Sequence, residues 1–366
     1  MQQVDVVVVG GGPAGSACAG GLVAAGLDVL VVDRARFPRD KPCAGWITPE
    51  VVEATAMDLA AYADGRTLQP IRRFRVGRVG GPARDVEYGE PVSFGILRRE
   101  FDAWLLERSG ARSCVMNVAS LQRSGGRWRV NDAVEAPFLV GAGGHFCPVA
   151  RRLKGSAAAP GAVVAQEMEI RLTEEQWARC RVAGDRPELD FTSDLDGYGW
   201  CFRKGEFLNV GLGRRDAPAL ASEVRAYLDW LRACGRIPPD LPAPLRGHAY
   251  RLREGAPPRI AGEGVLLAGD AAELAHAASG EGILPAIVSG QVAAEVVRDA
   301  ARGVANAFES YPARLAARVG PRSAWAPPGA LRALAGRAVL ASSWLTKRVV
   351  LDRLFLHRGA RAPVAS

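Results

Sequence analysis

The chain begins with a run rich in valine, from Val4 to Val9, and a cluster of glycines follows it directly. A β-branched run of this kind is typical of a central parallel strand that is covered on both faces. Next come a helical stretch, Ser16–Ala25, and a second apolar run, Val29–Val32, which ends at Asp33. The pattern predicts a strand, a tight turn, a helix and a second strand.

A different pattern occupies residues 161–245, where side chains alternate with a period of two. Apolar and polar residues alternate over Val163–Ile170, and aromatic residues alternate with other side chains over Gly197–Phe202. This alternation predicts antiparallel strands. Tyr198, Trp200 and Phe202 should share one face of their strand, and we expect Gly199 to leave the opposite face open.

These patterns predict an α/β (α+β) protein with a Rossmann-like nucleotide-binding domain, an inserted antiparallel β-sheet domain and a C-terminal helical tail. The 366 residues, of which 48% are hydrophobic, are enough for two domains with buried cores. We assign residues 1–75, 96–160 and 245–310 to the nucleotide-binding domain. The substrate domain then takes residues 76–95 and 161–244, and the helical segment takes residues 311–366.

The net charge of +8 is concentrated in the tail. Residues 330–366 hold seven basic side chains against Asp352, a net +6, which leaves +2 for the rest of the chain. A net positive charge concentrated in one segment, with no nucleic-acid-binding motif, argues against a nucleic-acid partner. The tail could be a basic amphipathic surface for membranes or a helix packed on the protein with snorkelling arginines. The basic residues are Arg332, Arg337, Lys347, Arg348, Arg353, Arg358 and Arg361.

Seven scattered cysteines without CxxC pairs suggest neither a disulfide framework nor a zinc site. No metal cluster and no Ser/His/Asp set has recognisable local spacing. We therefore expect a cytoplasmic protein, with peripheral membrane contact through the tail as the alternative location.

The glycines after the first strand form a G-x-G-x-x-G over Gly10–Gly15, with Pro13 and Ala14 inside it. The first glycine allows the tight turn, the second lets a pyrophosphate approach the backbone, and the third lets helix and strand pack closely. Asp33 follows Gly10 by 23 residues and can accept a hydrogen bond from a ribose hydroxyl. The context predicts a dinucleotide site, but it does not distinguish NAD from FAD.

A second glycine-rich block lies far along the chain. A short apolar strand, Val265–Leu267, leads to Gly269 and Asp270, and Ser279–Ile283 opens a helical stretch, Leu284–Arg302. The carboxylate of Asp270 could accept hydrogen bonds from a polyhydroxyl chain. The positive end of the long helix could stabilise negative charge.

With this block the chain resembles the flavoprotein superfamily of the aromatic hydroxylases, and within it the geranylgeranyl reductase-like branch. The resemblance rests on the fingerprint, on Lys41–Gly45 (K-P-C-A-G), on Arg98–Asp102 (R-R-E-F-D), and on the Gly269-Asp270 and Gly280–Ile283 block. It spans roughly residues 4–300 and implies FAD as the bound cofactor, with NAD(P)H as the expected electron donor. The residues expected at FAD are Gly10, Gly12, Pro13, Ala14, Gly15, Asp33, Arg34, Ala44, Gly45, Arg98, Val118, Gly269, Asp270, Gly280, Gly282 and Ile283.

The chain departs from the hydroxylases of this superfamily in two places. Val140–Gly144 has glycine where those enzymes carry an Asp-Gly pair that helps bind FAD and NADPH, and Leu284 stands in place of an asparagine. The halogenase motif W-x-W-x-I-P is also missing, with Trp200 as the nearest match. These differences favour the reductase branch.

The aromatic strand resembles the Y-x-W-x-F-P motif of the geranylgeranyl reductases, with Arg203 in place of the proline. The resemblance implies that Tyr198, Trp200 and Phe202 line a substrate channel, and we place Trp46 there with them. The alternative is an aromatic stripe packed in a domain core.

Cys43 is the candidate catalytic residue, because the resemblance places it next to the substrate, where a thiol could donate a proton. An inert buried cysteine is the alternative. His276 could relay protons or serve as a structural histidine. Glu281 could be an active-site acid or could satisfy free amides at the helix start.

Together these features predict an FAD-dependent oxidoreductase that reduces a carbon–carbon double bond of an apolar, isoprenoid or polyketide-like substrate. The alternative is an FAD-dependent monooxygenase, such as a hydroxylase or epoxidase, or a halogenase. A flavin-binding or membrane-associated protein without catalytic activity is a third class. The substrate partner is a small apolar molecule in the first two.

Overall fold

The computed structural model of this chain describes residues 1–155, 161–215, 219–242, 244–322 and 336–358. In it the two apolar runs at the N-terminus form neighbouring strands, β2 (Val6–Val9) and β3 (Val29–Asp33), joined by helix α1 (Pro13–Ala24). Strand β2 pairs in parallel with β3 on one side and with β13 (Phe138–Gly141) on the other. The predicted central parallel strand is therefore confirmed.

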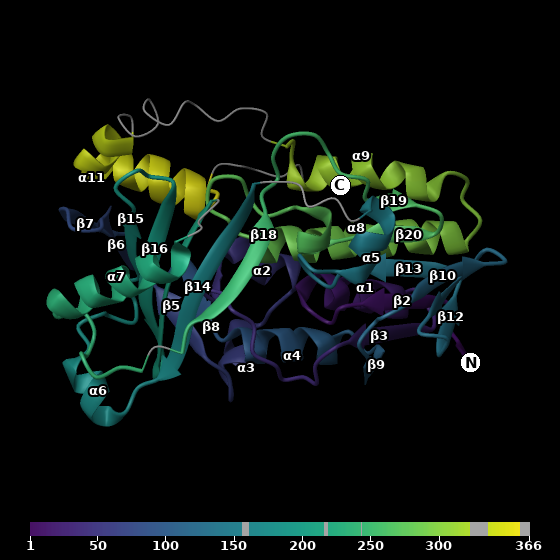
Figure 1. The fold of residues 1–366 in the computed structure, drawn as a ribbon, viewed down its shortest axis with the longest axis horizontal. Helices are drawn as coiled ribbons and strands as arrows, with labels where there is room; N and C mark the ends of the chain where they lie inside the picture. The colour runs from purple at the N-terminus through teal and green to yellow at the C-terminus, as the bar shows by residue number, and fades with distance from the viewer. Residues whose placement is uncertain (156–160, 216–218, 243, 323–335, 359–366) are drawn as a thin grey trace.

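The full sheet has six strands in the order β19-β20-β13-β2-β3-β9. The outer strands are β19 (Ala261–Gly262), β20 (Val265–Leu267) and β9 (Arg112–Val115). Helices α1, α8 (Ile283–Ala301) and α9 (Ala307–Val319) form layers on one side of it (Figure 1).

Helices α1 and α8 approach each other closely because small residues line their contact. A Cβ atom on Gly290 of α8 would lie 2.2 Å from the carbonyl oxygen of Ala14 in α1. Only glycine allows this separation, which brings the N-terminal half of α8 against the first turn of α1. The two glycine-rich blocks, far apart in sequence, are joined by this contact.

Smaller elements complete this half of the molecule. A four-stranded sheet lies beside the six-stranded one, and β11 and β12 contact β13 and β2. Helix α4 (Arg98–Arg108) packs against α1, and α5 (Pro148–Lys154) packs against β13. The strands of the small sheet are β1 (Gln2–Gln3), β10 (Leu121–Ser124), β11 (Arg127–Val130) and β12 (Val134–Ala136).

The second large sheet has seven strands in the order β18-β14-β17-β16-β15-β6-β7. All neighbours are antiparallel except β15 and β6. Helix α7 (Leu220–Ala233) covers one face (Figure 1), and the other face lines the cavity described below. The predicted fold class is confirmed. The strands are β18 (Arg246–Arg251), β14 (Ala162–Arg171), β17 (Phe207–Arg215), β16 (Gly197–Lys204), β15 (Glu188–Phe191), β6 (Arg73–Arg78) and β7 (Ala83–Glu87).

The expectation that Gly199 leaves an open face is wrong. A Cβ atom at Gly199 would lie 2.5 Å from Cζ of Tyr227, whose ring packs on the strand from α7. The Tyr227 hydroxyl donates a hydrogen bond of 2.8 Å to Asp190. The glycine makes room for the buried ring of Tyr227, which comes from another element of the fold.

A further sheet has three strands in the order β4-β8-β5. Its strands are β4 (Trp46–Ile47), β5 (Leu68–Ile71) and β8 (Ser93–Ile96). The short helices are α2 (Pro49–Ala54), α3 (Leu59–Ala63), α6 (Glu174–Arg179) and the 3-10 turn η1 (Gly269–Ala272).

The described part of the tail folds back on the seven-stranded sheet. Residues 336–341 are helical, and α11 (Ser343–Leu345) leads into η2 (Thr346–Phe355), a π-helix. Leu351 and Phe355 of η2 are buried against aromatic residues of that sheet, and Tyr88 donates a hydrogen bond of 2.8 Å to Asp352. The tail therefore packs on the protein, as in the second of the two sequence alternatives; its basic residues Arg332 and Arg361 lie outside the described residues.

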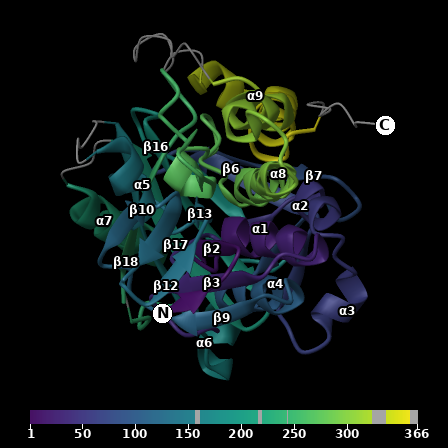
Figure 2. The ribbon, with the colours of Figure 1, turned by 90° about the vertical axis from the view of Figure 1, so that its right-hand side faces the viewer.

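Figure 2 shows the layers from the side of the parallel sheet. The proposed domain boundaries stay a prediction. Strands β6 and β8 each span one of them, and β18, assigned to the nucleotide-binding domain, pairs in the seven-stranded sheet. Over the described residues, no helix is long and apolar enough to cross a membrane.

Candidate functional site

A cavity of about 620 Å³ lies where the carboxyl ends of the parallel strands meet the exposed face of the seven-stranded sheet. Ligands in α/β proteins bind at this edge of a parallel sheet. Among the residues predicted at FAD, all but Gly15 and Gly45 line this cavity. All four predicted substrate residues and Cys43 line it as well.

Gly15 and Gly45 have packing roles. A Cβ atom on Gly15 would lie 1.8 Å from the carbonyl oxygen of Gly10, so this glycine lets α1 lie against β2. Gly45 has a positive φ of 66°, and a Cβ there would lie 2.2 Å from the carbonyl oxygen of Ile96. Both glycines shape the cavity from behind its surface.

Two helices point their N-termini at the cavity without a capping hydrogen bond from their N-cap residues. The N-cap residues are Gly12 for α1 and Gly282 for α8, and neither first turn contains an acidic residue. Free N–H groups and the helix dipole at such an end favour an anionic group. The space around Gly12 is open, since its nearest neighbour is Arg39, 3.5 Å from a Cβ placed there.

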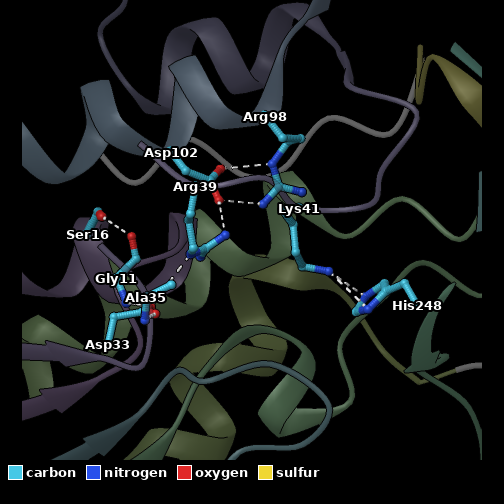
Figure 3. A network of polar contacts seen from close by, with 9 residues as sticks. All are labelled: Gly11, Ser16, Asp33, Ala35, Arg39, Lys41, Arg98, Asp102 and His248. Carbon is cyan, nitrogen blue, oxygen red and sulfur yellow. Dashed lines mark hydrogen bonds and ion pairs between the residues drawn. The ribbon is translucent and has the colours of Figure 1, made fainter. Parts of the chain in front are cut away.

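Asp33 lies at the end of β3, where the fingerprint predicted it. Its two oxygens accept hydrogen bonds from the backbone N–H groups of Gly11 at 2.9 Å and Ala35 at 3.0 Å. These bonds hold the carboxylate at the cavity, beside the glycine turn (Figure 3). Its predicted bond to a ribose hydroxyl stays a prediction.

Arg98 is buried at the start of α4 and forms a bidentate ion pair with Asp102, at 2.8 and 3.0 Å. Arg39 reaches the same carboxylate, 3.3 Å away (Figure 3). The Asp102 side chain is fully buried, so one buried anion orients two cations at the cavity. The predicted contact of Arg98 with the cofactor stays a prediction.

A second polar network surrounds Asp270, whose carboxylate lies 3.4 Å from Nε2 of His248. Lys41 lies 3.0 Å from Nδ1 of His248 (Figure 3). The same ammonium group lies 2.9 Å from Nε2, so Lys41 contacts both ring nitrogens of His248. Burial lowers the pKa of His248, so the ring is neutral at pH 7.

The same surroundings alter the other two groups of this network. Burial, together with the charge of Arg98, lowers the pKa of Lys41 to about 8. Burial alone would raise the pKa of Asp270, but the bond from His248 and the nearby cations outweigh it and lower that pKa. Lys41 belongs to the K-P-C motif, whereas no sequence signal pointed to His248.

Four polar side chains from the seven-stranded sheet support the Cys43 loop, and we call them the buried cluster: Glu167, Glu169, Lys204 and Asn209. The Lys204 side chain is fully buried and donates to the carbonyl oxygens of Ala44 at 3.0 Å and Ile96 at 2.9 Å, and to Glu169. Asn209 donates to the carbonyl oxygen of Cys43 at 3.2 Å. Sequence reasoning missed the whole cluster.

The cavity is closed on the other side by aromatic residues, which we call the aromatic wall: Trp46, Tyr198, Trp200, Phe202 and Phe355. The indole of Trp200 lies across β17, because Gly211 has no Cβ; one placed there would be 2.3 Å from the ring. Phe355 stacks on Trp46 with ring centroids 5.6 Å apart. The aromatic stripe was expected either to line a channel or to pack in a domain core. Trp200 and Phe202 do both, because they are buried and also line the cavity.

His276 is absent from the lining of this cavity. Its ring faces that of His357 at 4.3 Å, and burial together with His357 lowers the pKa of His276 to about 4. Glu281 lines the cavity, and its carboxylate accepts a hydrogen bond of 2.7 Å from the backbone N–H of Leu284 at the start of α8. Burial raises the pKa of Glu281 to about 7.

Comparison with known proteins identifies a family model and several relatives that match this chain. The FAD binding domain family model matches residues 3–59. A menaquinone reductase of Mycobacterium tuberculosis is 32% identical over 327 residues, which cover 82% of this chain and 78% of that protein. Digeranylgeranylglycerophospholipid reductase 1 of Methanopyrus kandleri is 30% identical over 325 residues, 81% of each chain.

A solved structure has the same fold. It is that of a geranylgeranyl bacteriochlorophyll reductase-like protein from Thermoplasma acidophilum, with a TM-score of 0.73 and 22% identity. The match covers 96% of this chain and 91% of that chain.

Proposed function

Because the chain belongs to the geranylgeranyl reductase-like family of FAD-dependent oxidoreductases, we propose that it reduces a carbon–carbon double bond of an apolar isoprenoid substrate. One observation carries this proposal. A single cavity joins the residues predicted at FAD to the aromatic wall, so a flat cofactor and an apolar chain can meet there.

The residues present fit FAD. The turn at Gly12 and the uncapped end of α1 suit the pyrophosphate, and Asp33 suits the adenosine ribose. Asp270, together with the glycine turn before α8, suits the flavin half. When bound and reduced, FAD supplies a hydride equivalent.

The protein's own residues orient the substrate and exclude water. The aromatic wall offers apolar surface, and Phe355 closes it from the tail, in T-shaped contact with Tyr198 at 5.3 Å. Cys43 lines the cavity with Arg98 beside it, and its role as proton donor stays a prediction.

NAD(P)H is the electron donor that we propose. The residues around Val140–Gly144 that the hydroxylases use for FAD and NADPH differ here, so the donor must be identified directly. Mixing the oxidised holoenzyme anaerobically with NADH or NADPH, and following the loss of flavin absorbance, gives the answer.

We also propose that the tail contacts the membrane surface at its outer side. Trp344 is 67% exposed, and Arg348 and Arg353 are exposed on the same segment that covers the aromatic wall. Aromatic and cationic side chains together favour anionic lipid interfaces. This arrangement would let an apolar substrate enter from the lipid phase.

An anaerobic assay tests the proposed reaction. The holoenzyme, with its FAD reduced by dithionite, is mixed with geranylgeranyl diphosphate, and the products are analysed by mass spectrometry. We expect a gain of two hydrogens per reduced bond without oxygen. A product that forms only when air is admitted, and that carries oxygen or halogen, would instead identify a monooxygenase or halogenase.

A further inference from the structure

Glu167 lies in the wall between two cavities. Beside the large cavity is a smaller one of about 140 Å³, whose lining includes the exposed side chains of Arg99 and Arg246. Four residues line both cavities: Asp40, Lys41, Pro42 and Glu167. Of the two carboxyl groups among them, that of Asp40 is exposed and pairs with Arg246 at 2.7 Å, whereas Glu167 is only 6% exposed.

The buried cluster leaves Glu167 without a cation of its own. Lys204 uses its three N–H groups on Ala44, Ile96 and Glu169. Two carboxyl groups and one ammonium group in a buried site favour a proton on one of the carboxyls. Because Glu169 has the ion pair, the proton belongs on Glu167.

The hydrogen bonds of Asn209 also indicate that Glu167 carries a proton. Its Nδ2 faces Glu167 at 2.5 Å, Glu169 at 3.1 Å and the Cys43 carbonyl at 3.2 Å, which are three acceptors for two hydrogens. The amide cannot be turned over, because Nε1 of Trp200 donates to its Oδ1 at 2.7 Å. A proton on Glu167 relieves this shortage of donors around the two carboxyls.

The groups that face Glu167 come from every element packed against it. Burial raises the pKa of Glu167 to about 7; Lys204 lowers it, Glu169 raises it, and Asn209 and the backbone of Cys43 lower it. Arg246 is its partner in register on β18. The acid form is therefore present at neutral pH and below.

We propose that Glu167 supplies the proton for the double-bond reduction and that water in the smaller cavity restores it. This inference rests on the proposed function. The hydride, with its two electrons, adds to one alkene carbon. The O–H bond of Glu167 breaks as a C–H bond forms at the neighbouring carbon, and the carboxylate then takes a proton from solvent. The donor that reduces the cofactor supplies the two electrons.

Glu281 is the other carboxyl group of the large cavity whose pKa burial raises to about 7, but its position suits this role less well. Its carboxylate is held by the N–H of Leu284, and it is absent from the lining of the smaller cavity. Replacing each acid in turn separates the two.

The test uses the holoenzyme in an anaerobic single turnover. With FAD reduced by dithionite and geranylgeranyl diphosphate as the probe, flavin reoxidation is followed by absorbance. We expect Glu167→Gln to slow reoxidation by about 100-fold or more, the usual contribution of general acid catalysis. The wild-type rate should fall as the pH rises above 7, and Glu167→Asp should restore part of it.

A matched control is Glu206→Gln on the same sheet, an exposed carboxylate paired with Arg171, which should leave the rate unchanged. FAD affinity, measured by fluorescence titration, should be the same in all variants. Infrared difference spectra of wild type against Glu167→Gln should show a carboxylic acid band that disappears near pH 7.

Two results would overturn the inference and leave the proposed function intact: a wild-type rate in Glu167→Gln, or a loss confined to Glu281→Gln. If the wild-type holoenzyme reduces no alkene, the proposed function itself fails, and the role of Glu167 fails with it.

Discussion

The buried cluster shares one face of the seven-stranded sheet with Tyr198, Trp200 and Phe202, and Trp46 of β4 and Phe355 of η2 complete the aromatic wall. The two regions are built in different ways. The cluster depends on individual hydrogen bonds, as at Lys204, where every donor has an acceptor. The wall depends on apolar area and ring contacts, as between Trp46 and Phe355. A buried hydrogen-bonding side chain cannot be replaced by an apolar one of similar size without leaving its partner unsatisfied. Apolar packing, in contrast, tolerates substitutions that conserve volume.

The comparison also shows how the two parts cooperate. Trp200 belongs to the aromatic wall, but its Nε1–H donates to Asn209 of the buried cluster. That bond sets the orientation of the Asn209 amide and therefore the direction in which it donates to Glu167. Through Asn209, Trp200 of the aromatic wall therefore sets the hydrogen-bond geometry at Glu167.

The largest effect should come from removing the ammonium of the cluster. Lys204→Met leaves two carbonyl oxygens without a donor and Glu169 without its cation. Breaking a buried ion pair on one side costs about 3–5 kcal/mol. Urea unfolding should show this loss of stability. Phe202→Leu, two residues away in the wall, should cost only about 1 kcal/mol; equal losses would contradict the contrast.

The next effect depends on pH and isolates Glu167. Its pKa is raised from 4.5 to about 7 in the folded protein, so folding favours the protonated form. The stability that this proton provides is present below pH 4.5 and is lost as the pH rises to 7. Gln does not titrate. The unfolding free energy of Glu167→Gln should therefore gain about 3 kcal/mol relative to wild type across this interval.

Urea unfolding at several pH values measures this difference. All other titrating groups are common to both proteins, so the shape of the difference curve belongs to Glu167. Glu206→Gln, an exposed carboxylate on the same sheet, should give a flat difference. A flat curve for Glu167→Gln as well would mean that folding does not raise the pKa of Glu167.

The hydrogen bond from Trp200 to Asn209, which links the two regions, should contribute less to the free energy of unfolding. Trp200→Phe keeps an aromatic ring over Gly211 but removes the donor to Asn209. An unsatisfied buried acceptor costs about 1–3 kcal/mol, and we expect the lower end because the amide can then turn over. The double variant Trp200→Phe with Glu167→Gln should be less destabilised than the sum of the two, as coupled residues are. Strict additivity would show that the two regions act independently.

The same contrast explains what could be predicted from the sequence. The glycine fingerprint, Asp33 and the aromatic strand are local patterns, because period and spacing along one segment determine which side chains share a face. The fold class and the cavity residues on these segments could therefore be read directly. Gly199 shows the limit of such reading, since the partner that fills its space, Tyr227, comes from another element.

The buried cluster could not be predicted, because its members come from three strands and meet only through the sheet register. Glu167 looks like an ordinary polar position in an alternating strand, and nothing local indicates that Asn209 and Lys204 will face it. His248 and Phe355 were missed for the same reason. The charged tail is visible in the composition, but its apolar contact with the wall depends on residues 44–202.

The smallest effect on stability should come from the outer side of the tail. Trp344 is 67% exposed, so Trp344→Ala should change the unfolding free energy by less than about 0.5 kcal/mol. Leu351, buried on the inner side of the same segment, should cost about 2–5 kcal/mol when changed to alanine. If the outer side contacts lipid, Trp344→Ala should still weaken sedimentation with anionic phosphatidylglycerol vesicles, and less so with neutral phosphatidylcholine vesicles. If variant and wild type bind anionic vesicles equally, the tail has a packing role alone. That role is already explained, because the buried apolar residues of η2 all lie on its inner side.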